Sequence, residues 1–292
     1  MNLKTWSLLA LLPLVGCVAM PQYIPLEPRS AAAIKDMRLV SAIYQDEIYL
    51  SAASPGVVAG AGGGLLAGVI ESQIAKGRQD EIQAVVNPFY ASIDDVDFRK
   101  VYWAAVLPEF QKLHGAKITE TKTTAAIIPN LERGKLSTTL AAGKGLLYLQ
   151  TRYSFTPDFA ALEVVTNADL WVGGRADLAF SNVFTYRSAN IGRTGRDAIA
   201  LWGRDGGKRY RALLNEGIAE TVRMIRLDAA HPRIKGLDQN LPGSDRSIEV
   251  RKAGPSGPAV AGPLLADQPA RVVVRNTDGQ MFSLPRRTRT GR

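Results

Sequence analysis

Histidine and cysteine are almost missing from this chain. Its 292 residues include two histidines, His114 and His231, and one cysteine, Cys17. A single cysteine excludes an internal disulfide, and so few histidines and cysteines cannot build the usual zinc sites. The fold must therefore depend on a packed interior, for which 46% hydrophobic residues are sufficient.

Recognisable catalytic motifs are also missing. No serine lies in a Gly-x-Ser-x-Gly elbow, and the stretch Arg204–Lys208 lacks the spacing of a Walker loop. Both histidines adjoin a glycine or a proline at the expected end of a helix, where a positive charge favours the helix dipole. Asp94, Asp95 and Asp97 lack the glycine and the terminal glutamate of a calcium loop. We therefore predict a chain that is not an enzyme and that holds no metal and no cofactor.

The first residues have the features of a secretory signal. Lys4 supplies a positive charge, Trp6–Val15 an apolar core too short to span a bilayer, and Gly16 a small residue. The motif Leu14-Val15-Gly16-Cys17 resembles the lipobox of bacterial lipoproteins. This resemblance implies cleavage between Gly16 and Cys17, lipid on the Cys17 sulfur and an acylated new amino terminus. The alternative is an ordinary signal peptide that happens to contain a cysteine.

Such a lipid anchor also predicts a location. In many bacterial lipoproteins an aspartate after the cysteine retains the protein in the inner membrane, and this chain has Val18 there. The resemblance therefore implies the outer membrane, with the domain facing the periplasm. Pro21, Pro25 and Pro28 favour extended backbone, so we predict a tether over residues 17–33.

A glycine-rich segment follows at residues 51–70. Gly56, Gly60, Gly64 and Gly68 recur at every fourth position, which would form one side-chain-free stripe on a helix for close helix packing. The pattern resembles the glycine zippers of several bacterial envelope lipoproteins. Ile48–Ile70 carries no charged residue and is long enough to cross a bilayer.

Three interpretations of this segment remain open. It is a helix packed inside the soluble domain, a self-associating zipper that contacts lipid, or a phosphate-binding loop. The loop interpretation depends on Gly62-x-Gly64-x-x-Ala67, with Asp80 where a ribose-binding acid would follow. A single glycine fingerprint is weak evidence, and the residues after it have helical rather than strand periodicity. The sequence therefore favours packing inside the domain.

Hydrophobic periodicity predicts an α+β fold with an antiparallel meander. Turn signals separate the strand-like runs between Ala116 and Trp202, and no helix is predicted among them. We expect the helices Phe98–Leu113 and Lys208–Ala230 to cover the buried face of this sheet, and one of Asp94, Asp95 and Asp97 to cap the first of them. The predicted elements are strands within 31–50, a helix over 65–93 kinked or broken near Ala84 by Pro88, a helix over 98–113, strands over 118–128, 146–155, 162–172, 178–186 and 198–202, a turn over 204–207 and a helix over 208–230.

The C-terminal part has a different composition. Glycine and proline dominate 236–268, which predicts a flexible linker, and Asn276-Thr277-Asp278-Gly279 is the turn of a hairpin within 269–292. A hairpin alone is marginally stable, so it should dock on the main sheet or on a partner. Much of the net charge of +9 falls after Arg233. The final arginines predict contact with anionic lipid or polysaccharide, or simply a solvated tail, but no nucleic acid in an exported protein. They are Arg286, Arg287, Arg289 and Arg292.

Together these features predict five segments: a signal peptide (1–16), a lipidated tether (17–33), an α+β domain (34–235), a linker (236–268) and a basic hairpin (269–292). The first functional hypothesis is a non-catalytic component of the envelope that binds a protein partner or another copy of itself. The second is a periplasmic ligand-binding or enzymatic domain, with a site near Gly60–Gly68 or on the polar sheet face. The third is a glycine-zipper oligomer that contacts lipid.

Overall fold

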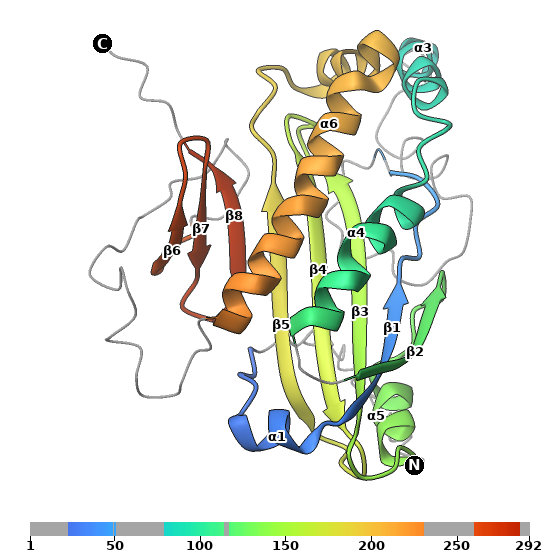
Figure 1. The fold of residues 1–292 in the computed structure, drawn as a ribbon. Helices are drawn as coiled ribbons and strands as arrows, with labels where there is room; N and C mark the ends of the chain where they lie inside the picture. The colour runs from blue at the N-terminus through green and yellow to red at the C-terminus, as the bar shows by residue number, and fades with distance from the viewer. Residues whose placement is uncertain (1–22, 49, 51–78, 114–116, 231–259, 287–292) are drawn as a thin grey trace, which may run out of the picture.

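The computed structural model describes residues 23–48, 50, 79–113, 117–230 and 260–286. Within these ranges the chain forms one mixed sheet of eight strands, with helices packed on it (Figure 1). The α+β architecture predicted from hydrophobic periodicity is confirmed. None of the helices in the described part is both long and apolar enough to span a bilayer.

The strands lie in the order β2-β1-β3-β4-β5-β8-β7-β6 across the sheet. Strands β3, β4 and β5 form the antiparallel meander that the sequence predicts. Strand β1 is parallel to both β2 and β3, and β8 is parallel to β5, because the intervening helices return the chain to the same end of the sheet. The bounds are β1 Asp36–Ala42, β2 Lys117–Thr124, β3 Lys144–Phe155, β4 Leu162–Val172, β5 Leu178–Arg187, β6 Leu264–Asp267, β7 Arg271–Arg275 and β8 Met281–Pro285.

Two helices cover one face of the sheet. Helices α4 and α6 lie side by side across this surface, which we call the helix face (Figure 1). Alternate residues of the central strands point toward it, and they pack with the apolar stripe of α6 into the main core. Helix α5 lies against the opposite surface, the far face, where it contacts β4. The bounds are α1 Pro28–Ala33, α3 Gln79–Ala91, α4 Phe98–Leu113, α5 Asn130–Thr138 and α6 Gly195–Ala230.

Helix α6 is in fact two helices joined by a turn. Asp205, Gly206 and Gly207 have φ values of 53°, 63° and 67°, so the chain turns where the sequence predicts and then continues helically to Ala230. The segment Ala198–Trp202, predicted as a strand, is helical instead. Its buried residues Ala198, Ile199 and Trp202 have helical spacing, and a run this short is ambiguous from periodicity alone.

The two prolines inside helices do not end them. Helix α3 continues from Gln79 to Ala91 through Pro88, so of the predicted kink or break near Ala84 the break is wrong. Val86 and Phe89 are buried on either side of Pro88, and their packing offsets the backbone hydrogen bond that proline removes. Helix α4 likewise contains Pro108.

Helix α4 buries a narrower face than predicted. Phe98, Tyr102 and Val106 are at most 1% exposed, whereas Val101 is 42% exposed. Asp97 caps the helix as expected, because its Oδ1 accepts a hydrogen bond from Lys100 N at 3.0 Å. The sequence therefore located this helix and its start correctly but overestimated its buried stripe.

The N-terminal segment belongs to the fold from Tyr23 onward. Ile24 forms an antiparallel bridge with Ser181 of β5, through backbone hydrogen bonds of 2.8 and 2.9 Å. Residues 28–33 form helix α1, with Pro28 in its first turn, although an extended tether was predicted through residue 33. The sequence rule failed here because proline is favoured at the start of a helix as well as in extended chain. Only residues 18–22 separate Cys17 from the described fold.

The C-terminal hairpin is part of the same sheet. Strands β7 and β8 pair as predicted, and Gly279 N donates to Asn276 O at 2.9 Å across the turn. Strand β8 pairs with Phe184–Tyr186 of β5, so the hairpin docks on the main sheet (Figure 1). A third strand, β6, lies within 236–268, the range predicted to be linker, and pairs with β7.

Helix α5 has no counterpart in the sequence prediction. The predicted strand 118–128 ends early, at Thr124, and nine residues of helix follow between β2 and β3. Leu131, Leu136 and Leu140 are too few and too irregularly spaced to give a helical signal.

Candidate functional site

Most of the site residues predicted from the sequence lie outside the described residues. Cys17 and Gly16 of the lipid-attachment motif are among them, as are both histidines. The glycine-rich segment, with the zipper glycines Gly56, Gly60, Gly64 and Gly68 and the proposed loop residues Gly62 and Ala67, is also outside. For Asp80 only the backbone, in α3, is described. These predictions therefore stay predictions.

The acidic residues before α4 have roles in the fold. Asp97 is the cap of α4, and Asp95 accepts two hydrogen bonds from the Arg211 guanidinium, one of them 3.0 Å long. The hydrogen bond from Arg211 lowers the pKa of Asp95 below its ordinary value. Asp94 lines a surface hollow together with Asp95, Asp97, Asp46, Arg99, Lys100 and Trp103. Across the described residues no three His, Cys, Asp or Glu side chains converge as metal ligands would.

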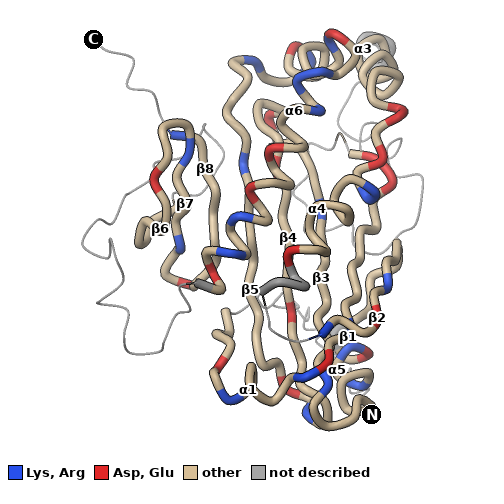
Figure 2. Tube along the Cα trace, viewed as in Figure 1, with Lys and Arg blue, Asp and Glu red and all other residues tan. Residues whose placement is uncertain are grey.

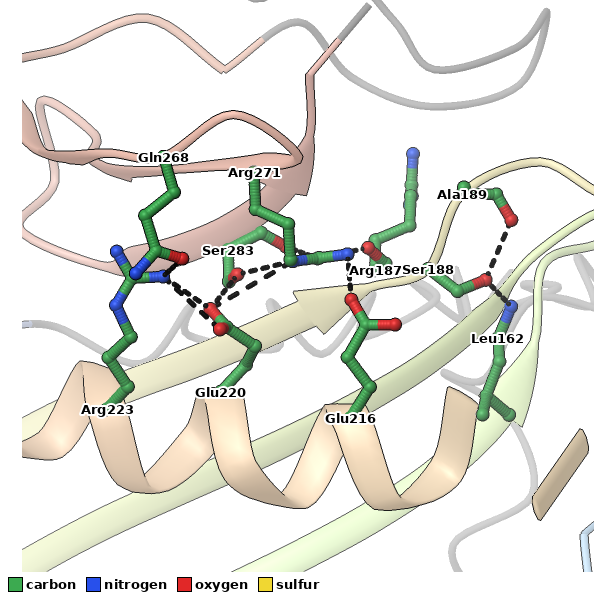
Figure 3. A network of polar contacts seen from close by, with 10 residues as sticks. All are labelled: Leu162, Arg187, Ser188, Ala189, Glu216, Glu220, Arg223, Gln268, Arg271 and Ser283. Carbon is green, nitrogen blue, oxygen red and sulfur yellow. Dashed lines mark hydrogen bonds and ion pairs between the residues drawn. The ribbon is translucent and has the colours of Figure 1, made fainter. Parts of the chain in front are cut away.

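A buried polar network joins the C-terminal hairpin to α6 (Figure 3). The guanidinium of Arg271 donates to Glu216 at 2.8 Å and to Ser283 O at 2.8 Å, and it lies 4.4 Å from the ring centre of Tyr186. Glu220 accepts hydrogen bonds from Ser283 Oγ and from Arg223. Apart from Leu162 N of β4, which donates to Ser188 Oγ, the polar groups drawn come from β5, α6, the hairpin or the residues beside them. The contacts of Arg271 and Glu220 therefore stabilise the docked hairpin.

A second buried ion pair lies beside this network. Arg275 Nη2 and Asp228 Oδ1 are 2.7 Å apart, and both side chains are at most 6% exposed. Burial raises the pKa of Asp228, and the Arg275 charge opposes this rise. Because each charge lacks water, each depends on the other, and the pair fixes β7 against the last turns of α6.

The polar far face carries an arginine clamp around α5. Arg133 Nη1 donates to Asp169 Oδ2 at 2.7 Å, and its guanidinium lies 4.4 Å from the ring centre of Tyr148 and 5.6 Å from that of Trp171. Ser181 Oγ donates to the other oxygen of Asp169 at 2.8 Å. These buried polar and aromatic contacts hold α5 against the far face.

Of the four C-terminal arginines, the structure describes only Arg286. Arg286 pairs with Asp267 of β6, so this member of the predicted anion-binding cluster has a partner within the fold. Arg287, Arg289 and Arg292 lie outside the described residues.

Strand β2 takes part neither in the buried polar networks nor in the contacts of α5, and it is largely exposed. It lies at one end of the strand order, paired with β1 on one side only, and its side chains are exposed except for Ile118 and Thr124, which are half-buried. Its sequence alternates threonine with charged residues over Thr119–Lys122, and this absence of an apolar face is the sequence signal of a strand that is exposed on both faces. Within the described residues no element covers this edge.

The outward backbone groups of β2 follow from its pairing with β1. Ile43 N donates to Thr124 O at 3.0 Å, so the backbone groups of Thr124 point toward β1. Because these groups alternate in direction along a strand, the N–H and C=O groups of Thr121 and Thr123 point away from the sheet. This row of donors and acceptors can accept another strand.

The far-face side chains of β2 carry both signs of charge. Glu120 pairs with Arg38 at 3.0 Å and remains 53% exposed, and Lys122, two residues farther along, is exposed on the same face. An exposed lysine on an edge strand normally disfavours pairing with a second copy of the strand, because the two lysines repel each other. Here Glu120 lies two residues from Lys122, so in one alignment of the two strands each lysine would face a glutamate.

Comparison of the whole chain with protein-family models, curated proteins and solved structures gives no match to any of them.

Proposed function

We propose that this chain is a lipid-anchored, non-catalytic assembly component of the bacterial envelope. Cys17 anchors it in the outer membrane, the folded domain faces the periplasm, and the domain works by extending its sheet through β2. The lipobox-like motif Leu14–Cys17 supports the anchor. The observation that carries the assembly role is the open edge at β2, with outward backbone groups at Thr121 and Thr123.

The partner that fits this edge best is a second copy of the chain. In an antiparallel pair centred on Thr121, each Thr121 faces its counterpart, and Glu120 of either copy faces Lys122 of the other. Opposite charges on facing positions contribute about 0.2–1 kcal/mol each, and this register forms two such pairs. Moving the centre of the pair by one residue places like charges opposite each other, Glu120 against Glu120 or Lys122 against Lys122, which disfavours those registers.

Disulfide trapping tests this register. In a chain with Cys17→Ser, Thr121→Cys would introduce the only thiol. Directly opposed residues of a hydrogen-bonded antiparallel pair have Cα atoms about 5.5 Å apart, which is within the range that a disulfide spans. We expect oxidation to give a covalent dimer rapidly on a non-reducing gel. The matched control is Thr138→Cys on α5, also exposed. Equal rates for the two variants would contradict the proposed pairing.

A proline on the same strand separates assembly from folding. Thr121→Pro removes a backbone N–H that points outward, so β1 and β2 stay paired while the second copy loses a hydrogen bond. We expect the dimer to dissociate in light scattering after chromatography, with an unchanged circular dichroism spectrum. A chain that is monomeric before any substitution would refute the assembly role, whatever is attached to Cys17.

The charge pattern supplies a second control. Glu120→Lys turns two attractive pairs into repulsive ones, so the dimer should weaken by about tenfold or more. Glu120→Lys combined with Lys122→Glu restores complementarity in the same register and should recover the dimer. The anchor is tested separately, by mass spectrometry of the native protein, where an unmodified Cys17 thiol would refute it.

A further inference from the structure

An exposed apolar surface lies on and before α5. Leu131 is 74% exposed and Leu136 is 37% exposed, and with Val101 they are the exposed large hydrophobic residues of the described chain. The uncharged residues 125–131 lead into the helix, and Ala125, Ala126 and Pro129 are exposed as well. Leu131 follows the exposed Ala125, Ala126 and Pro129 within seven residues of the chain, and adjoining exposed apolar residues are typical of a contact surface.

This surface belongs to the far face of the sheet. Ile128 N donates to the Tyr148 hydroxyl at 3.1 Å, and Ile128 packs in the small far-face core that includes Val40 and Leu146. Arg133 holds α5 onto the same core through Asp169 and Tyr148. Leu131 is thus presented by a helix that is fixed in place.

Basic side chains surround the same end of the sheet. Figure 2 shows Lys and Arg along α1 and α5, which lie at one end of the strands. The exposed members are Arg29, Lys35, Lys117, Lys135, Lys144 and Arg175, and the exposed acidic residues near them are Glu27, Glu132 and Asp177. An apolar centre with surplus positive charge around it fits a bilayer with anionic headgroups.

The N-terminal segment enters the fold at this end. The residues from Cys17 to Tyr23 span at most about 20 Å when fully extended, because each residue adds about 3.4 Å. Beyond Tyr23, α1 leads to Lys35, whose N–H donates to Gly143 O at 2.8 Å, in the loop that follows α5. A lipid on Cys17 would therefore keep the surface around α5 close to the membrane.

We propose that α5 and residues 125–131 form a membrane-contact surface, in which Leu131 and Leu136 enter the headgroup region and the surrounding basic side chains bind anionic lipid. The proposal depends on the lipid anchor proposed above. It also agrees with the proposed dimer, because a two-fold axis perpendicular to the sheet at β2 places α5 of both copies on the same side. Both copies can then contact one bilayer.

A fluorescent probe tests the contact without any lipid on the protein. The chain is prepared from residue 17 onward with Cys17→Ser, which keeps every described residue, and Leu131→Cys is labelled with an environment-sensitive fluorophore. We expect a blue shift with phosphatidylglycerol-containing vesicles at low ionic strength, and a much smaller one with phosphatidylcholine alone. Val101→Cys, exposed on α4 at the helix face, is the matched control. An equal shift at both positions, or none at Leu131→Cys, would overturn the proposal.

Sedimentation with the same vesicles supplies the second measurement. Leu131→Ser with Leu136→Ser should weaken binding at least tenfold, whereas Val101→Ser should leave it unchanged. Unchanged binding of the double variant would overturn the proposed surface. Because the protein in these experiments carries no lipid, their outcome is independent of whether native Cys17 is modified.

Discussion

At Gly217 the backbone of α6 touches the sheet. A Cβ atom there would lie 2.8 Å from Tyr186 Cδ1 and 2.9 Å from Val164 Cγ2, which is closer than carbon atoms normally approach. Gly217 shares helical spacing with the buried Leu214 and Ile218, but this spacing gives no sign of how close the helix and the sheet are. Distance across an interface is a property of two elements, so a single helical pattern cannot reveal it.

We expect Gly217→Ala to destabilise the protein, although alanine is the better helix former. The gain in helix propensity is about 1 kcal/mol, whereas overpacking in a core typically costs about 1–3 kcal/mol. Urea denaturation should show a net loss of free energy of unfolding. Asn215→Ala, at an exposed position two residues earlier, is the control and should be neutral or slightly stabilising. A stabilised Gly217→Ala variant would mean that the helix and the sheet are farther apart.

At the level of elements, the strongest periodic segments were predicted well. Strands β3, β4 and β5 and the second half of α6 each bury a regular set of large side chains, and periodicity detects such sets directly. Elements with few apolar residues were missed or shortened, as α1, α5 and β6 show. These elements are stabilised by contacts with the rest of the fold, such as Arg133 with Tyr148, which no local pattern contains.

The attachment of β7 to α6 depends on buried charges. Arg271 and Arg275 flank the three valines of β7, and their exposures are only 6% and 1%, although arginine is rarely buried in proteins. Acidic residues of α6 compensate them. Their burial becomes evident only from the tertiary structure, in which α6 packs against the hairpin and pairs with both arginines.

We expect Arg275→Met to destabilise the protein more at pH 7 than at pH 4. Burial already raises the pKa of Asp228, and removing the Arg275 charge raises it further. As the pH falls toward the ordinary range of aspartate, the raised pKa favours protonated Asp228 in the folded state, and the neutral carboxyl group needs no cation. At pH 7 the variant must either bury an unpaired charge or bind a proton, which costs about 3–5 kcal/mol.

The measurement is chemical denaturation at both pH values. Adding Asp228→Asn to Arg275→Met removes the charge that was left unpaired, so most of the loss at pH 7 should be recovered and its dependence on pH should disappear. The same loss at both pH values would show that Asp228 does not titrate in this range.

At the level of the whole molecule, the predicted domain and hairpin form one folded unit. The sheet is continuous from β2 to β6, and ion pairs join the hairpin to α6. The sequence separated the hairpin from the domain because residues 236–268 are rich in glycine and proline. A glycine- and proline-rich composition indicates that a segment connects two parts of the chain. It does not show where the strands that follow the segment will pair with the sheet.

We therefore expect a single unfolding transition in scanning calorimetry, with equal calorimetric and van't Hoff enthalpies for the chain without lipid. Arg271→Ala should lower the Tm of that one transition by several degrees, because it leaves Glu216 and Glu220 without their buried partner. Lys135→Ala on the surface of α5 should have little effect. Two separate transitions, with only the smaller one moved by Arg271→Ala, would show that the hairpin unfolds by itself.

The sequence by itself determined the fold class, the meander, the two long helices, a cap by one of Asp94, Asp95 and Asp97, and the turn before Lys208, because each of these depends on residues close together in the chain. It also supplies the lipobox-like motif at Cys17, on which the proposed location depends. Only the tertiary structure decided that the N-terminal segment joins the sheet at Ile24, that β2 forms its open edge and that Leu131 is exposed on a fixed helix. These features depend on contacts between residues that are far apart in the sequence. Burial, strand pairing and exposure are therefore determined only when the chain folds.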